Sequence, residues 1–242
     1  MKKHVLSIKD ICNILSQLPD EKKYLPSFFS PELAESLYTE YMDKTVNDNV
    51  AREELKKKLN GQSILLICPG ATIKTHKNEI DEYISKNAPV IISLNFISSN
   101  FNADFEFISN SLRYSQIIGV YADVENKPKI LLTSNITPSP ALTNDFIFNF
   151  KTLYDETNGD VCAVLLLNLL LSIGIKEIAF AGFDGFDSGN KSYFDSGYIL
   201  SFDDQSNEKI ERELKTVKSK YDCSNIKFIT PSEFEDIFYD GN

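Results

Sequence analysis

The chain has 242 residues, of which 42% are hydrophobic and 25% charged, close to the averages of globular proteins. This length suits one large domain, or one domain with a small appendage. The net charge of −10 argues against a nucleic-acid partner and against an anionic membrane surface. The longest apolar run, over 161–173, is too short to cross a membrane, and no signal-peptide core follows Met1. We therefore expect a cytoplasmic protein.

Residues 1–60 predict helices only. Apolar residues recur at helical spacing over 8–15 and again over 33–41, the second time after a Ser-Pro helix start. A third helix is predicted over 50–59, before an Asn-Gly stop. Because three short helices bury no core of their own, we assign 1–60 as a helical N-terminal segment that packs on the rest.

From residue 61 the pattern changes to alternating strands and helices, which predicts a doubly wound, mostly parallel Rossmann-like α/β domain over 61–242. Continuous apolar runs are typical of parallel strands that are buried on both faces. We predict strands over 63–67, 89–94, 105–108, 116–120, 129–132, 177–181 and 226–229. We predict helices over 74–86, 160–173 and 207–220, and a last helix that Thr230-Pro231 opens.

Ligands of open parallel sheets bind outside the carboxyl ends of the strands. Three predicted strands end in a hydroxyl residue and an asparagine, and the resulting candidate ligand-binding residues are Asn95, Ser109, Asn110, Ser134 and Asn135. Such a cluster of neutral donors and acceptors suits a sugar, a nucleoside or a small polar metabolite. Asparagine also favours turns, so simple strand termination is the alternative at each position.

Two predicted helix starts could receive a phosphate or carboxylate, because free backbone N–H groups and the helix dipole favour anions there. The first turn contributes Gly70, Ala71 and Thr72, and the second contributes Thr157, Asn158, Gly159 and Asp160. Neither matches a P-loop or a G-x-G-x-x-G fingerprint. Asp160 could instead simply complement the helix dipole.

The candidate catalytic groups follow the strand over 177–181, and they are Asp184, Asp187 and Tyr193. With His4 and His76 the only histidines, a histidine-based triad or zinc site has almost no candidates, so a general base would be a carboxylate or a tyrosine. The acidic residues after this strand could hold Mg²⁺ or form a solvated loop: Asp184, Asp187, Asp195, Asp203 and Asp204. We assign no metal ligand among them.

Four stretches follow the order of motifs in a known family: the turn over 67–73, Asn95 at a strand end, the helix start over 157–163, and residues 174–184, which include Gly182. On these stretches the chain resembles the Rossmann-like family of small bacterial CMP-sialic-acid sialyltransferases, and the related 6-hydroxymethylpterin pyrophosphokinase-like proteins. The resemblance implies a site for cytidine or another nucleotide. The sialyltransferases use a histidine base beyond the last motif, whereas this chain has no histidine after His76.

Residues 6–10, 64–70, 91–97, 108–114 and 182–186 are similar to a second group. It is the C-terminal region of bacterial 4-hydroxy-2-oxovalerate aldolase-like proteins, whose N-terminal half is a metal-dependent barrel of the HMG-CoA lyase type and which often occur with surface-polysaccharide genes. The resemblance implies a lyase-type barrel as partner, in cis or in trans. Such a barrel takes about 250 residues and metal-binding histidines, so aldolase activity is not expected from this chain.

Three hypotheses follow. The first is an accessory domain that binds a nucleotide-activated sugar or small polar metabolite and works with an aldolase-type barrel in surface-polysaccharide biosynthesis. The second is an active glycosyl- or nucleotidyl-transferase that uses Asp184, Asp187 or Tyr193 in place of histidine. The third is a structural assembly module that binds no small ligand. The sequence leaves a homo-oligomer open.

Overall fold

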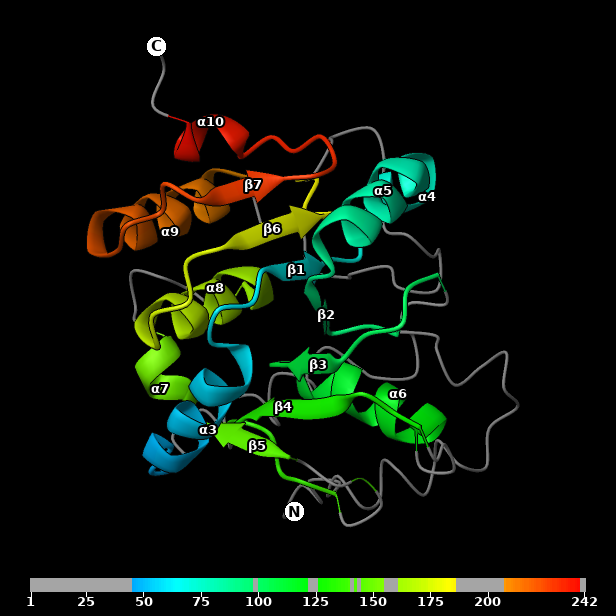
Figure 1. Ribbon diagram of the computed structural model, residues 1–242. Coiled ribbons are helices and arrows are strands. Elements are labelled where there is room, and N and C mark those ends of the chain that lie inside the picture. The colour runs from blue at the N-terminus through cyan, green and yellow to red at the C-terminus, as the bar shows by residue number, and fades with distance from the viewer. Residues whose placement is uncertain are drawn as a thin grey trace, which may run out of the picture.

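The fold is a single parallel sheet with helices on both faces, as the computed structural model in Figure 1 shows. The structure describes residues 45–97, 100–121, 126–139, 142, 145–154, 161–185 and 207–239. The strands within these residues are β1 (Ile64–Ile67), β2 (Val90–Leu94), β3 (Phe105–Ile108), β4 (Lys129–Thr133), β5 (Phe146–Phe148), β6 (Ile178–Ala181) and β7 (Ile226–Phe228). They pair in the order β5-β4-β3-β2-β1-β6-β7, every neighbour parallel, which confirms the doubly wound Rossmann-like α/β class.

Helices cover the two faces of the sheet in separate groups (Figure 1). The described helices are α3 (Asn49–Leu59), α4 (Thr72–Thr75), α5 (Lys77–Asn87), α6 (Ser111–Tyr121), α7 (Phe150–Leu153), α8 (Cys162–Ser172), α9 (Asn207–Lys220) and α10 (Glu235–Phe238). One face packs against α3, α7, α8, α9 and α10 in one large core. The opposite face has two smaller cores, one under α4 and α5 and one under α6.

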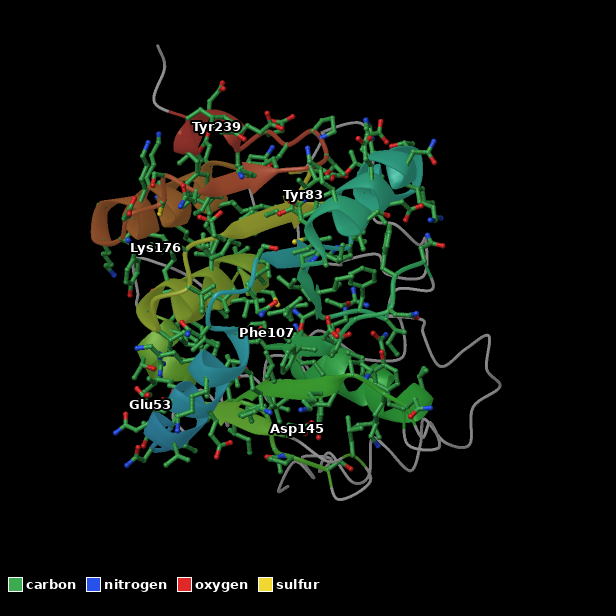
Figure 2. The ribbon with its side chains drawn as sticks, viewed as in Figure 1. Glu53, Tyr83, Phe107, Asp145, Lys176 and Tyr239 are labelled. Atoms are coloured by element: carbon green, nitrogen blue, oxygen red, sulfur yellow. The ribbon has the colours of Figure 1, made fainter. Side chains whose placement is uncertain are left out.

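Alternation along each strand explains why both faces are apolar. In β1, Leu66 faces the large core and Leu65 faces the α5 side, and both are fully buried. Helix α8 is buried from Ala163 to Leu171, because it belongs to the large core and also contacts α7 and α9. Figure 2 shows the resulting contrast between Phe107 in the interior and Glu53 on the outer side of α3.

Helix α3 is part of the large core. Leu55 and Leu59 are fully buried, and the helix contacts β5. Arg52 fastens it further, since its guanidinium donates hydrogen bonds of 2.8 Å to the hydroxyls of Ser172 and Thr152 and of 2.9 Å to Asp48. The helix predicted over 50–59 is therefore confirmed. The other helices predicted within 1–60 lie outside the described residues.

The strand predicted over 116–120 is wrong, because these residues form the second half of α6. Tyr114, Ile117, Ile118 and Tyr121 are buried at a spacing of three and four residues, so the apolar run is one side of a helix. Asn110 begins this helix, since its side-chain Oδ1 accepts a hydrogen bond of 3.1 Å from the Arg113 N–H.

The other differences concern short elements. Strand β5 and helix α7 were not predicted at all, and the helix predicted over 74–86 is divided at His76 into α4 and α5. The last helix begins at Glu235 rather than directly after Pro231. Across the described ranges, no helix is both long enough and apolar enough to span a membrane.

Candidate functional site

The candidate site lies at the carboxyl edge of the sheet, where the chain reverses its direction of strand addition. Strand β1 pairs with β2 on one side and with β6 on the other, and from this point the sheet grows outward in both directions. In open α/β sheets this reversal point is where ligands bind. The loops that follow β1, β2, β3, β4 and β6 carry every described residue of the predicted site.

The loops after β1 and β6 touch through two glycines. The Gly70 N–H donates a 2.9 Å hydrogen bond to the Gly182 carbonyl. A Cβ at Gly70 would come well under 3.0 Å from that carbonyl, and one at Gly182 would do the same to the carbonyl of Cys68. Gly182 also has φ +72°, which side chains other than glycine rarely adopt. Both glycines are therefore required for the loops to meet.

Asp184 closes this junction from the β6 side. Its Oδ2 accepts a 2.9 Å hydrogen bond from the Thr72 N–H, and its Oδ1 accepts one from the Thr72 hydroxyl. Thr230, after β7, completes the group: its Oγ1 lies 3.0 Å from Thr72 Oγ1 and accepts a 2.9 Å hydrogen bond from the Gly182 N–H. Desolvation raises the pKa of Asp184, against the opposing effect of the Thr72 hydrogen bonds. The backbone N–H of Thr72, predicted to receive a ligand anion, thus has a carboxylate of the same chain as its partner.

The loops after β2, β3 and β4 are joined by neutral side chains. Asn95 has φ +56°, and its Oδ1 accepts a 3.0 Å hydrogen bond from the Ser109 N–H. Its Nδ2 lies 3.5 Å from the Ser109 hydroxyl. Asn135 donates 3.1 Å to the Ser109 carbonyl and accepts from Thr133 at 2.5 Å. The predicted residues Asn95, Ser109 and Asn135 therefore form one hydrogen-bonded row across three strands.

Two other predicted residues have local structural partners. The Ser134 hydroxyl accepts a 3.0 Å hydrogen bond from the Phe150 N–H at the start of α7. Asn110 caps α6, as described above. Ser134 and Asn110 thus bind backbone N–H groups at the starts of α7 and α6, a structural role that serine and asparagine commonly have.

Cys162 is a site residue that the sequence analysis did not select. It is the first residue of α8, and hydrogen bonding by Ser109 and Asn95 lowers the pKa of its thiol against the larger effect of burial. Burial raises the pKa of this thiol to about 12. Burial also raises the pKa of Cys68, and the nearby Cys162 and Asp184 add to that effect. Both thiols are therefore protonated and uncharged at neutral pH.

Glu106 is the second residue that was missed. Its side chain is fully buried in β3, and its Oε1 accepts a 3.1 Å hydrogen bond from the Phe96 N–H. Burial raises the pKa of Glu106 well above the usual value, against hydrogen bonds from Ser93 and Phe96 that lower it. A signal was present in the sequence, because a charged residue inside the run Phe-Glu-Phe-Ile must point into one of the two covered faces.

The remaining predicted site residues lie outside the described residues. They are the catalytic candidates Asp187 and Tyr193, the helix-start residues Thr157, Asn158, Gly159 and Asp160, and the further acidic residues Asp195, Asp203 and Asp204. In the part of the chain that the structure describes, no three His, Cys, Asp or Glu side chains gather as metal ligands do.

The described edge is thus a set of amides, hydroxyls and protonated thiols next to one carboxylate with partners of its own. Such groups orient a polar ligand by hydrogen bonds. No protein-family model matches the chain, and no curated protein is significantly similar to it.

Proposed function

We propose that this chain is a binding domain for a small polar ligand, of the kind that the nucleoside or sugar part of a nucleotide-activated sugar presents. The observation that carries the proposal is the group formed by Asn95, Ser109 and Cys162, which follow β2, follow β3 and begin α8, and which meet at the carboxyl edge of the sheet next to its reversal point. An amide, a hydroxyl and a thiol together offer both donors and acceptors without a charge.

The states of Cys162 and Asp184 favour binding over turnover at these two side chains. A nucleophile or general base works best with a pKa near the operating pH, whereas the Cys162 thiol has a pKa of about 12. Both oxygens of Asp184 accept hydrogen bonds from Thr72, so this carboxylate already has a structural task. The transferase alternative would depend on Asp184 leaving Thr72, or on Asp187 or Tyr193.

The wider role is inferred from the resemblance to the aldolase-like proteins. On that basis the domain serves a lyase-type barrel, in cis or in trans, by holding a nucleotide-activated sugar during surface-polysaccharide biosynthesis. The fold and the neutral edge are compatible with this role, and the ligand test below is its first requirement.

The test is a thermal-shift titration against CMP, CDP, UDP, ATP and CMP-sialic acid, with and without Mg²⁺. A specific ligand at a hundredfold excess over Kd adds about 2.7 kcal/mol to stability. For a chain of this size, 1 kcal/mol raises the Tm by roughly 2–4 °C, so the expected shift is several degrees. Asn95→Asp keeps the acceptor for the Ser109 N–H but loses the Nδ2 donor, and we expect it to reduce the shift by more than half.

The matched control is Asn87→Asp, the same chemical change on the exposed end of α5, where the Asn87 side chain donates to the Tyr83 carbonyl of the same helix. It should leave the ligand shift unchanged. The absence of a shift with every compound would contradict the proposal and favour the assembly module. An equal loss in the two variants would remove Asn95 from the site.

A further inference from the structure

The turn after β2 holds Asn95 in an unusual backbone conformation, and hydrogen bonds to the main chain of Phe96 stabilise this turn. Asn95 has φ +56°, a region that most side chains avoid. The main chain of Phe96 is held at both ends: its N–H donates 3.1 Å to Glu106 Oε1, and its carbonyl accepts 2.5 Å from the Ser93 hydroxyl. Ser93 and Glu106 are paired in register on β2 and β3, so they point to the same face of the sheet.

The hydroxyl of Ser93 is already engaged with the main chain of Phe96. Ser93 has a single hydroxyl hydrogen, and the contact with the Phe96 carbonyl uses it, because a carbonyl cannot donate. Ser93 therefore has no hydrogen left to donate to the Glu106 carboxyl in this arrangement.

Burial favours the neutral form of Glu106. The Glu106 side chain has no exposed area, and its Oε2 has no hydrogen-bond partner among the described residues. An ionised carboxylate there would leave Oε2 without a partner among the described residues, and burying an unpaired charge is costly enough that groups neutralise instead. A neutral carboxyl group avoids this cost, and its register partner on β2 is the uncharged Ser93.

We propose that Glu106, in its protonated form, is the positioning residue of the site: with Ser93 it clamps the main chain of Phe96 and thereby sets Asn95 in the left-handed conformation that turns its amide toward Ser109. This inference rests on the proposed function for the role of Asn95 as a ligand contact. The clamp itself is a property of the free protein, so it can be tested without any ligand.

Helices α8 and α6 bring one titratable and one charged side chain to this part of the sheet. Cys162 of α8 is coupled to it electrostatically, and its thiol is protonated at neutral pH. Arg113 lies buried on α6, which packs on β3, and it donates a 3.0 Å hydrogen bond to Gln116. From β2 the neighbouring side chain is Ser93, and from β4 it is the apolar Ile130.

The first arm of the test measures the proton. The infrared difference spectrum between the wild-type chain and Glu106→Gln at neutral pH should show the carbonyl band of a protonated carboxylic acid, lost in the variant. A difference spectrum that contains only carboxylate bands would overturn the proposal.

The second arm measures the position of Asn95 from the ¹⁵N signals of its side-chain amide and of the Phe96 backbone amide. Glu106→Gln keeps an acceptor for the Phe96 N–H in a side chain of the same shape, so both signals should stay near their wild-type places. Glu106→Ala and Ser93→Ala should displace both signals. The control Glu79→Ala, an exposed position on α5, should displace neither.

The outcomes separate the clamp from a general role in packing. Displacement by alanine with rescue by glutamine supports the clamp, even if no nucleotide binds. Equal displacement by alanine and glutamine, or none in either, refutes it. Should Glu106→Ala fail to fold, the comparison of Ser93→Ala with Glu106→Gln decides the same question.

Discussion

The two halves of the carboxyl edge are built by different means. At the β1–β6 junction, backbone touches backbone through Gly70 and Gly182, and a carboxylate fastens the contact. Along β2, β3 and β4, neutral side chains bridge the loops, with Asn95 and Ser109 as the central pair. The first half is held by close backbone packing and one carboxylate, whereas the second is held by hydrogen bonds from neutral side chains.

This difference shows what a glycine-containing turn means in this fold. The turn over 69–72 looks like an anion site from its sequence, because its backbone N–H groups stand at the start of a helix. In the structure, Asp184 supplies the anion from within the chain. The proposed binding role therefore belongs to the neutral half of the edge.

The largest expected effect comes from a substitution that disrupts the contact between the loops after β1 and β6. Gly182→Ala places a Cβ against the Cys68 carbonyl at φ +72°, which adds overpacking to an unfavourable backbone conformation. We expect a loss of about 3 kcal/mol in the free energy of unfolding, measured by urea denaturation. Gly61→Ala is the matched control, since Gly61 has φ +74° with nothing within 4 Å of its Cβ position, and it should lose only about 1 kcal/mol. Equal losses would mean that the close contact carries no energy.

The second prediction concerns pH and the neutral half. The pKa of Glu106 is raised by burial, so the folded chain keeps a proton that the unfolded chain has lost. Stability from this group is complete below the unfolded pKa of about 4.3 and falls as pH rises through the folded pKa. The slope can reach about 1.4 kcal/mol per pH unit, and Glu106→Gln should remove it.

The measurement is a series of urea unfolding curves across pH for the wild-type chain and Glu106→Gln. Glu79→Gln, on the exposed part of α5, serves as the control and should follow the wild type. Parallel pH profiles for the wild type and Glu106→Gln would show that this carboxyl does not titrate with folding.

The third prediction tests whether Asp184 has a structural role or a catalytic one. Asp184→Asn keeps one acceptor for Thr72 and loses the charge, so we expect a loss of about 1–2 kcal/mol in stability. The nucleotide-induced thermal shift should remain, since the neutral half is intact. If the variant folds but shows no nucleotide-induced thermal shift, Asp184 belongs to the ligand site, and this result would favour the transferase hypothesis.

The smallest expected effect compares two residues with positive φ. Ala88 ends α5 at φ 45°, and its N–H donates to the Ile84 carbonyl. Ala88→Gly should stabilise the protein by about 0.5–1 kcal/mol, because glycine accepts this conformation freely. Asn95→Gly should destabilise it, because the Ser109 N–H loses its partner. A gain in both variants would show that the Asn95 side chain contributes nothing.

The sequence predicted the fold well where each strand is a buried apolar run, as in β1 and β2. It failed over 116–120, where the local run looks like a strand and only the wider spacing from Tyr114 to Tyr121 reveals a helix. Strand β5 was missed because three residues at the edge of a sheet show no period. Short elements of this kind are set by packing against their neighbours.

The sequence predicted where the candidate site lies, but not which hydrogen-bond partner each of its side chains has. The rule for parallel sheets placed Asn95, Ser109 and Asn135 on one edge, and they do lie together. Which partner each side chain has depends on contacts between distant parts of the chain. Thr72 and Asp184 are 112 residues apart, and no local pattern in either loop signals their contact.

The place of α3 has a practical consequence for engineering. Leu55 and Leu59 fill the large core, and Arg52 reaches the hydroxyls of Thr152 and Ser172. A shortened version that begins at residue 61 would keep every strand of the sheet, yet it would open a hole in the hydrophobic interior. A truncated protein for nucleotide-binding assays should therefore begin before Asp48. The Asp48 carboxylate accepts hydrogen bonds from the Arg52 guanidinium and from the Asn149 N–H.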